Sequence, residues 1–302
     1  MRDTANATKQ FQESIKYIRW VIDTLEIPGL SDIHIHFMPD NVMEKVWRYF
    51  DEKGPLIGRD WPILYKLPTI DRMTLLDEMG VIEFPSLCYP HKANMAEWLN
   101  DWCTDFAQSH PQVVHSGTFF PEVNAVNYVK RSLREGSKVF KAHIQVGGYD
   151  PRDLLLQGVW ELLQEARVPV VVHCGSAPIP GPFTGITPML DVLRNFPKLK
   201  LVIAHMGNHQ YAEFLQLASD FENVYLDTTM AFTPFTDLTD PFPANLIPKL
   251  KELQDKVVLG TDFPNIPYGY DVQIRSLFEL GLGEQWLANV LYYNGHRLLR
   301  TI

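Results

Sequence analysis

The sequence predicts an α/β protein whose eight strands close into a (β/α)₈ TIM barrel, and three observations support this fold class. Apolar extended runs alternate with helical patterns along the 302 residues, which predicts parallel strands joined by helices. Eight such units without a linker are typical of a single closed domain covering residues 1–302. Possible ligand groups follow the first, fifth, sixth and eighth runs, and a closed barrel gathers these strand ends at one rim, whereas an open sheet does not.

A leading helix and a long insertion frame the first strand. Apolar residues recur at helical spacing between Gln10 and Leu25, and Pro28 with Gly29 then ends this helix. The first strand covers residues 31–37. It is followed by an insertion, residues 37–68, that is dense in aromatic side chains and is expected to form a lid or binding loop.

The rest of the chain repeats the strand and helix pattern. Further strands are expected at residues 81–88, 113–120, 138–146, 168–173, 199–205, 223–229 and 256–262, although Pro85 weakens the first of them because proline lacks an N–H group. Helices are expected at residues 73–79, 93–107, 123–134, 154–166, 187–196, 210–218 and 244–254, with C-terminal helices at 272–280 and 284–299.

Composition indicates a folded, acidic protein. Hydrophobic residues make up 46% of the chain and charged residues 21%, which is ordinary for a globular domain. The formal charge of −9 argues against nucleic acid or an anionic membrane as a partner, because both attract basic surfaces. The N-terminus lacks the apolar core of a secretory signal, and no stretch is long enough to span a bilayer, so we expect a cytoplasmic protein.

The three cysteines, Cys88, Cys103 and Cys174, have no paired short spacing. An odd number without such spacing predicts neither a disulfide framework nor a thiolate zinc site. We expect three buried thiols.

The most informative stretch is the first strand. Asp32, His34 and His36 alternate with apolar residues, so the three polar side chains are expected on one face. Two neutral imidazoles at positions i and i+2 can reach one cation from the same side. A single histidine at a strand end is more often a hydrogen-bonded structural residue than a ligand. Here, however, three later apolar runs also end in a possible ligand or catalytic group, namely His173, His205 and Asp262.

Four motifs in this order resemble the amidohydrolase superfamily. They are Asp32–His36, Phe196–Gly207, Gly260–Pro264 and Asn294–Leu299. The resemblance is to the amidohydrolase-related (amidohydrolase 2) branch, which includes metal-dependent hydrolases and aminocarboxymuconate semialdehyde decarboxylase-like enzymes. It implies four metal ligands and one histidine that orients or deprotonates the attacking water. The ligands are His34, His36, His173 and Asp262, and the catalytic histidine is His205.

These residue types suit one divalent ion. Three neutral imidazoles and a carboxylate leave the ion positive and open to water, whose pKa falls toward neutrality. His205 then moves a proton, and Asp262 both binds the ion and accepts a hydrogen bond from the water. Asp32 is expected to orient a ligand histidine through its second ring nitrogen. We expect Zn, with Mn, Fe or Co as alternatives.

Lys141, His143 and Gln145 are expected on the inward face of the fourth strand. In related barrels a lysine on this strand can be carboxylated and bridge two metals. A single metal is favoured here because the branch that the chain resembles is mononuclear and carries a similar Lys-x-His element near the substrate. We therefore assign Lys141 and His143 to substrate binding.

Other residues are candidates for gripping the substrate. Arg48, Arg59 and Arg72 suit a carboxylate because a guanidinium offers two parallel donors, although a solvated surface charge is the more common role. Of these we assign Arg59 to the substrate. Aromatic residues of the insertion, with Phe183, Phe232 and Phe235 from later loops, are expected either to wall a pocket for a ring or to pack against one another or a second subunit.

The predicted function is hydrolysis of an amide, lactone or related carbonyl compound by metal-activated water. The first alternative is non-oxidative decarboxylation of an aromatic or enoic acid at the same site, and the second is a barrel that serves as a non-catalytic scaffold. The expected partner is a small carboxylate-bearing or aromatic molecule, and exposed aromatics in long loops suggest a homodimer. The sequence has no glycine-rich phosphate loop, nucleophile elbow or basic stripe.

Overall fold

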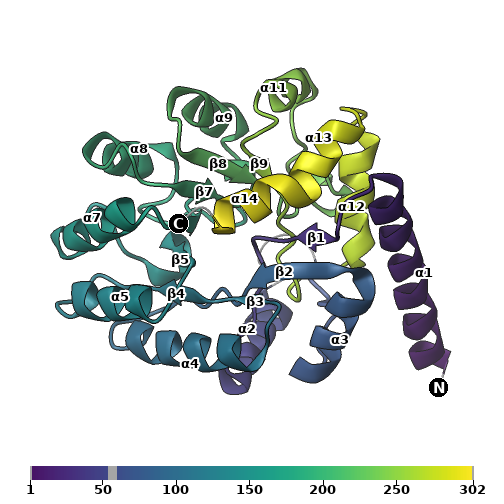
Figure 1. Cartoon of the computed structure of the whole chain (residues 1–302), viewed down its shortest axis with the longest axis horizontal. Coiled ribbons are helices and arrows are strands. Elements are labelled where there is room, and N and C mark those ends of the chain that lie inside the picture. Colours follow the sequence, from purple (N-terminus) through teal and green to yellow (C-terminus); the bar gives the residue numbers. More distant parts are fainter. Residues whose placement is uncertain (1, 54–59, 301–302) are drawn as a thin grey trace.

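A computed structural model describes residues 2–53 and 60–300, and its strands are all parallel. They form two hydrogen-bonded sets inside a ring of helices (Figure 1). The first set is β1 (Leu30–Ser31), β2 (Val81–Pro85) and β3 (Val113–Val114). The second set is β4 (Ser116–Thr118), β5 (Val139–His143), β6 (Val170–His173), β7 (Leu201–Ile203), β8 (Val224–Asp227) and β9 (Val257–Val258).

Backbone hydrogen bonds join the first strand to the last. The N–H of Ile33 donates to the carbonyl of Leu259 over 2.9 Å, and the N–H of His36 donates to the carbonyl of Phe263 over 2.7 Å. Only residue 115 separates β3 from β4, so these two pieces are one predicted strand with an interruption. The predicted (β/α)₈ TIM barrel is confirmed.

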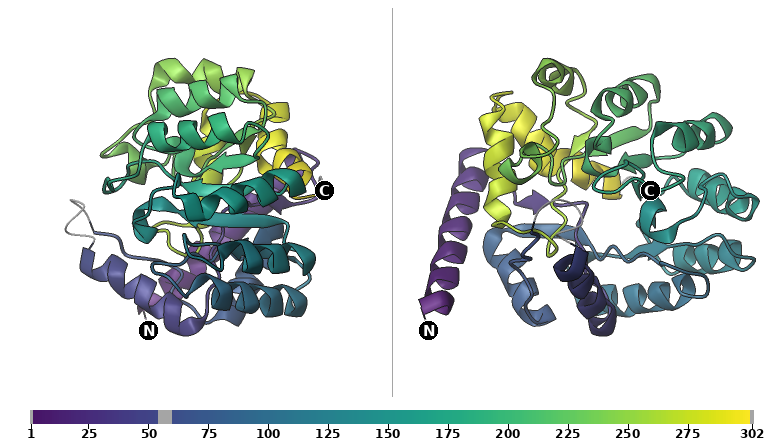
Figure 2. Two further views of the ribbon diagram at one scale, coloured as in Figure 1. Left: turned by 90° about the vertical axis from the view of Figure 1, so that its left-hand side faces the viewer. Right: turned by 180° about the vertical axis from the view of Figure 1, so that it is seen from behind.

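Helices surround the strands. The leading helix α1 (Arg2–Thr24) lies outside this ring, beside α3 and α12 (Figures 1 and 2). The outer helices are α3 (Thr69–Met79), α4 (Ala96–Ser109), α5 (Ala125–Arg134), α7 (Gln157–Ala166), α8 (Ile186–Asn195), α9 (Tyr211–Asp220), α11 (Ile247–Glu252) and α12 (Tyr270–Glu279). A C-terminal run joins α13 (Glu284–Ala288), a π-helix (Asn289–Tyr293) and α14 (Asn294–Arg300).

Short helices occupy several of the loops. They are α6 (Ile144–Gly147), α10 (Pro234–Asp237) and the 3₁₀ turns Leu154–Leu156, Ala204–Gly207 and Ala244–Leu246. The helix α6 contradicts the prediction that Gln145 lies on a strand, because β5 ends at His143 and residues 144–147 are helical.

The insertion after the first strand differs from the expected loop because it contains a helix, α2 (Asp40–Lys53). Apolar residues at Val42, Met43, Val46 and Trp47 have helical spacing, and they pack against buried residues of the barrel wall. Asp40 lies in the first turn, where a negative charge favours the positive end of the helix dipole.

Alternation along the strands divides the core into two layers. Val170 and Val172 of β6 pack outward beneath the helices, whereas Val171 belongs to an inner cluster with Val139 and Val202. Leu298 and Leu299 of α14 join this inner cluster, so α14 closes one end of the barrel (Figure 1). Further along the same inward faces of β5 and β6 come Lys141 and His173, above this apolar floor.

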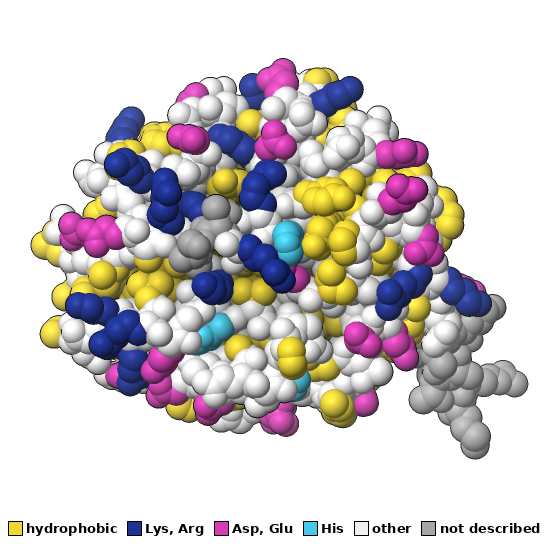
Figure 3. Space-filling model, in the orientation of Figure 1, with side chains coloured by type: hydrophobic (Ala, Val, Ile, Leu, Met, Phe, Trp, Pro, Cys, Tyr) yellow, Lys and Arg dark blue, Asp and Glu magenta, His cyan; other side chains and the backbone are white. Residues whose placement is uncertain are grey.

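The surface is mixed in charge. Basic and acidic side chains are both spread over the face shown in Figure 3. In the part of the chain that the structure describes, no helix combines the length and the apolar character that crossing a membrane requires.

Candidate metal centre

Three side chains from the first and last strand ends meet inside the barrel mouth. His34, His36 and Asp262 each offer one ligand atom, and these atoms all lie within 4.8 Å of one another. Nε2 of His36 is 2.9 Å from Oδ1 of Asp262, and Nε2 of His34 is 3.7 Å from the same oxygen. The structure therefore brings together three of the four residues predicted to bind a metal.

The other ring nitrogens of His34 and His36 are held by acceptors. Nδ1 of His34 donates to Oδ2 of Asp227 over 2.9 Å, and Nδ1 of His36 donates to the carbonyl of Leu87 over 2.6 Å. A carboxylate or carbonyl oxygen can only accept, so each neutral ring carries its proton on Nδ1. Both rings consequently turn the lone pair of Nε2 toward Asp262, as metal-binding histidines do.

Asp227 at the end of β8 was missed by the sequence analysis. Its Oδ2 binds His34, and its Oδ1 accepts the backbone N–H groups of His205 over 2.8 Å and Thr229 over 3.1 Å. One carboxylate thus orients one ring and anchors the backbone of a second histidine. The available signal was the apolar run Val224–Leu226, which ends in this aspartate as other runs end in His173 and Asp262.

The prediction that Asp32 orients a ligand ring is wrong. Its Oδ1 accepts the backbone N–H of His34 over 3.0 Å, and its Oδ2 accepts the hydroxyls of Thr261 over 2.6 Å and Tyr270 over 2.8 Å. Residues 32–37 continue beyond the two-residue strand β1 without regular strand geometry, so strict alternation does not hold there. Burial raises the pKa of Asp32 to about 7 despite its three hydrogen-bond donors.

Burial also sets the charges of the candidate ligands. It lowers the pKa of His34 to about 4, so this ring is neutral near pH 7. Burial alone would raise the pKa of Asp262, but the neighbouring histidine rings, with His36 the nearest at 2.9 Å, hold it below its usual range. The His34 ring likewise holds the pKa of Asp227 below its usual range, against the effect of burial. Neutral imidazoles and an ionised carboxylate are the forms that bind a divalent ion.

His173 and His205 border this group. Their ring centroids are 4.7 Å apart, and the His205 ring is 5.3 Å from the His34 ring. Nε2 of His173 donates to the carbonyl of Ala177 over 3.1 Å, which leaves Nδ1 as the lone-pair nitrogen of this ring. His173 is not one of the three residues whose ligand atoms lie within 4.8 Å, so its role as a ligand stays a prediction.

Strained backbone accompanies these strand ends. His205 and Asp262 have φ angles of 56° and 71°, in the left-handed region that residues other than glycine rarely adopt. Such strain persists where the surroundings fix the chain, and it clusters at functional sites.

Gly260, two residues before Asp262, is required because Thr229 and His34 lie too close to its backbone for a side chain to fit. A Cβ atom at Gly260 would lie 2.3 Å from Oγ1 of Thr229 and 2.9 Å from Cβ of His34. The glycine in the Gly-Thr-Asp motif therefore lets the last strand pass directly beside the first candidate ligand.

Lys141 and His143 lie at the same centre. Nζ of Lys141 is 2.8 Å from Nε2 of His34, and this lysine is completely buried. Burial lowers the pKa of Lys141 to about 8, partly offset by the charges of Asp227 and Asp262. The His143 ring stacks on His173 at 4.1 Å, and its Nδ1 accepts the N–H of Val146, which places the ring proton on Nε2.

The family model for amidohydrolases matches residues 31–301. The chain belongs to the amidohydrolase family. The match contains every residue of the metal centre described above, and the family is one of metal-dependent enzymes. A comparison with curated protein sequences finds no match.

Solved structures resemble this amidohydrolase in fold. An uncharacterised TIM-barrel protein from Bordetella bronchiseptica has a TM-score of 0.67 at 17% identity and covers 89% of this chain and 98% of its own. A 5-carboxyvanillate decarboxylase from Novosphingobium aromaticivorans, complexed with manganese and 4-hydroxy-3-methoxy-5-nitrobenzoic acid, has a TM-score of 0.64 at 15% identity. The match covers 90% of this chain and 96% of the decarboxylase. A probable 2-pyrone-4,6-dicarboxylic acid hydrolase from Acinetobacter baumannii with citric acid bound has a TM-score of 0.59 at 13% identity. The match covers 90% of this chain and 99% of the hydrolase.

The three arginines considered for the substrate have different positions in this amidohydrolase. Arg59 lies outside the described residues, and Arg48 is exposed. The expectation that these arginines are solvated surface residues is wrong for Arg72, whose side chain is buried at 1% exposure. Its guanidinium lies 4.9 Å from the ring centre of Phe37 and 5.4 Å from that of Trp47, because α2 folds over it.

The insertion and a later loop share an aromatic contact. The Trp61 and Phe235 rings are 4.8 Å apart, and Phe235 lies 6.0 Å from Tyr268. Phe232 instead pairs with Phe242 at 4.6 Å. The contact between Trp61 and Phe235 fits the alternative that these aromatics pack against one another, whereas a pocket for a ring substrate stays a prediction.

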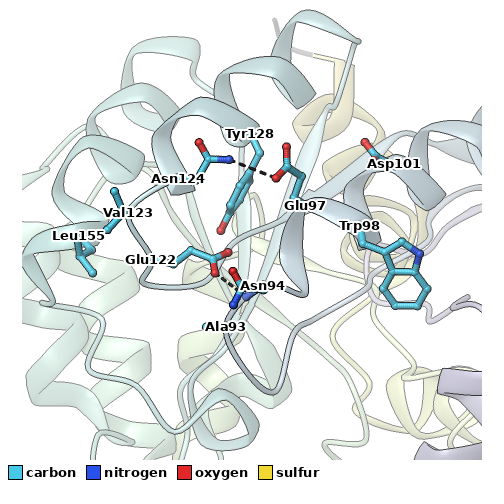
Figure 4. A pocket seen from close by; sticks show the side chains of 10 residues that line it. All are labelled: Ala93, Asn94, Glu97, Trp98, Asp101, Glu122, Val123, Asn124, Tyr128 and Leu155. Carbon is cyan, nitrogen blue, oxygen red and sulfur yellow. Dashed lines mark hydrogen bonds between the residues drawn. The ribbon is translucent and has the colours of Figure 1, made fainter.

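A separate hollow of about 690 Å³ lies on the outer wall between α4 and the start of α5 (Figure 4). Its lining includes Glu97, Glu122 and Tyr128, and Asn124 donates a hydrogen bond to Glu97. None of its described lining residues belongs to the metal centre, so we assign it no part in the chemistry.

Proposed function

We propose that the protein is a metal-dependent hydrolase of an amide, lactone or related carbonyl compound. The observation that carries this proposal is the convergence of His34, His36 and Asp262, with the His205 ring beside them. Membership of the amidohydrolase family supports metal-dependent chemistry at this place.

The residues fit one divalent ion. His34 and His36 present Nε2 lone pairs, Asp262 presents an ionised oxygen, and Nδ1 of His173 is the free nitrogen of its ring. We propose these four as ligands of Zn, with Mn, Fe or Co as alternatives. When bound, the ion supplies a Lewis acid that lowers the pKa of water and polarises the substrate oxygen.

His205 is the proposed general base. Burial lowers the pKa of His205 to about 4, so the ring holds a free lone pair near pH 7. It can take a proton from the attacking water and return it to the leaving group. The hydrogen bond from its backbone N–H to Asp227 fixes the residue relative to His34.

Lys141 and His143 are the proposed substrate-binding donors. The Lys141 ammonium and the Nε2–H of His143 both border the metal centre and suit a carbonyl or carboxylate oxygen. We propose that Arg59 assists them. These donors favour a carboxylate-bearing substrate.

Decarboxylation of an aromatic or enoic acid is the second candidate. Its specific support is the buried ammonium of Lys141, a cation that could pair with the carboxylate to be lost and then supply a proton. The fold is also shared with a 5-carboxyvanillate decarboxylase.

The decisive experiment assays metal-loaded protein on a panel of aromatic acids, lactones and amides. We expect new carboxylic acid to form from a lactone or amide without release of CO₂. Release of CO₂ from an acid would replace hydrolysis by decarboxylation. No turnover of either kind in protein holding about one ion per chain would contradict both, and protein that takes up no metal would favour the scaffold alternative.

A further inference from the structure

Asn265 connects the insertion to the candidate metal carboxylate. Its side-chain oxygen accepts the Nε1–H of Trp47 over 3.2 Å, and its backbone carbonyl accepts the Nε1–H of Trp61 over 2.7 Å. Its own N–H donates to the carbonyl of Asp262 over 2.8 Å. One residue, 2% exposed, thus contacts two tryptophans of the insertion and the backbone of Asp262.

More contacts join the same two segments. The N–H of Leu64 donates to the carbonyl of Ile266 over 3.1 Å, and the N–H of Tyr270 donates to the hydroxyl of Tyr65 over 2.8 Å. The Tyr65 ring lies 4.8 Å from the ring of Phe263, which directly follows Asp262. Both α2 and the returning part of the insertion therefore pack onto the loop that follows β9.

We propose that Asn265 is a positioning residue that couples the described parts of the insertion, residues 37–53 and 60–68, to Asp262, so that metal binding and the packing of these parts on the loop after β9 reinforce each other. The coupling rests on the proposed role of Asp262 as a ligand. It adds that Asn265 raises the metal affinity through Asp262, and that bound metal in turn stabilises a segment outside the metal centre.

The physical basis is the backbone of Asp262. Its φ of 71° is costly for an aspartate, and the surrounding contacts must hold it there. The hydrogen bond from Asn265 closes the turn behind Asp262, and the two tryptophans fix Asn265 in turn. Groups that orient a ligand from behind typically change metal affinity 10- to 100-fold, by order of magnitude. Because coupling is reciprocal, a metal that requires this backbone also stabilises the insertion packed on it.

The first test measures the Zn²⁺ and Mn²⁺ dissociation constants by competition with a chromophoric chelator. Trp47→Phe removes the N–H and keeps most of the ring, and Asn265→Ala removes the oxygen that accepts it. We expect each change to weaken binding about tenfold. The double variant should be no weaker than Asn265→Ala, because both changes break one interaction. Asn265→Asp keeps an acceptor oxygen and should retain most of the affinity.

The control is Trp98→Phe. Trp98 lies on α4, is 44% exposed and lines the outer hollow of Figure 4. This variant loses the same N–H group and should bind both metals as the wild type does.

The second test follows hydrogen exchange of residues 40–53 and 61–67 with and without Zn²⁺. We expect the metal to protect these amides in the wild type and to lose that effect in Asn265→Ala. The proposal is overturned if Trp47→Phe and Asn265→Ala bind metal normally, if their effects simply add, or if they lower only the melting temperature. Lack of turnover on the substrate panel would count against the proposed function and leave these affinity results standing. A wild type that binds no metal would overturn both.

Discussion

Nζ of Lys141 lies 2.8 Å from Nε2 of His34, the nitrogen that His34 also turns toward Asp262. Because Nδ1 of His34 donates to Asp227, Nε2 has only its lone pair to offer, and Lys141 donates to it. A metal ion bound by His34 would need the same lone pair. The ion and the ammonium are therefore competitors for one atom.

Lys141→Met should strengthen the binding of a single divalent ion. The change removes both a competing donor and a positive charge, and because like charges repel strongly at this range, we expect metal affinity to rise about tenfold. Catalysis should fall because a substrate-binding donor is lost. The dissociation constant and the turnover rate are measured together, with the change Lys138→Met, at an exposed lysine directly before β5, as the control. A loss of metal, with a carboxylated Lys141 found by mass spectrometry, would instead make the lysine a ligand.

His173→Ala and His205→Ala should differ in metal content. Loss of the proposed ligand His173 should lower metal content and activity together. Loss of the proposed base His205 should lower activity about 10²- to 10⁴-fold and leave most of the metal in place. Elemental analysis and rate measurements on the same preparations distinguish the two roles, and full activity in both variants would refute both assignments.

The metal-free protein should lose stability as the pH falls from about 6.5 to about 4. The pKa of His205 is about 4 in the folded chain, against an ordinary value of 6.5, because burial disfavours its charged form. Between these pH values the unfolded chain binds a proton at this histidine and the folded chain does not, so the free energy of unfolding decreases as the pH is lowered. Above pH 7 the group is neutral in both states and has no effect.

The His205→Gln variant isolates that contribution, since glutamine does not titrate. Urea unfolding across this range should show the wild type losing about 1 to 3 kcal/mol more than the variant. Parallel curves for the two proteins would mean that His205 ionises normally in the folded state.

Gly260→Ala should damage both stability and metal affinity. The added Cβ would overlap Oγ1 of Thr229 and crowd His34, so the strands must separate where the first candidate ligand is held. We expect a loss of about 1 to 3 kcal/mol in the free energy of unfolding, together with weaker metal binding. Gly181→Ala is the control, because its Cβ would meet its nearest neighbour at an ordinary 3.4 Å. Equal behaviour of the two variants would contradict this reading.

Sequence periodicity predicted the barrel because alternation and helical spacing are local signals. It also brought His34, His36 and Asp262 to one rim, since parallel strands end on one side. The partner of the His34 ring was not predictable in this way, because the choice of Asp227 over Asp32 depends on the irregular path of residues 32–37.

The insertion was also only partly predictable. Its helix α2 has ordinary amphipathic spacing, which the density of aromatic residues obscured. The burial of Arg72 depends on where α2 lands on the barrel, and the sequence near Arg72 carries no sign of that distant contact.

The irregular segment that carries His34 and His36 is bonded on both sides, to Leu87 through Ile35 and to Phe263 through His36. Deleting or adding a single residue there would have to shift these pairings together and would carry both imidazoles away from Asp262 at once. A change in the length of this short segment should therefore abolish metal binding, whereas a change in the length of an outer loop should leave both imidazoles in place.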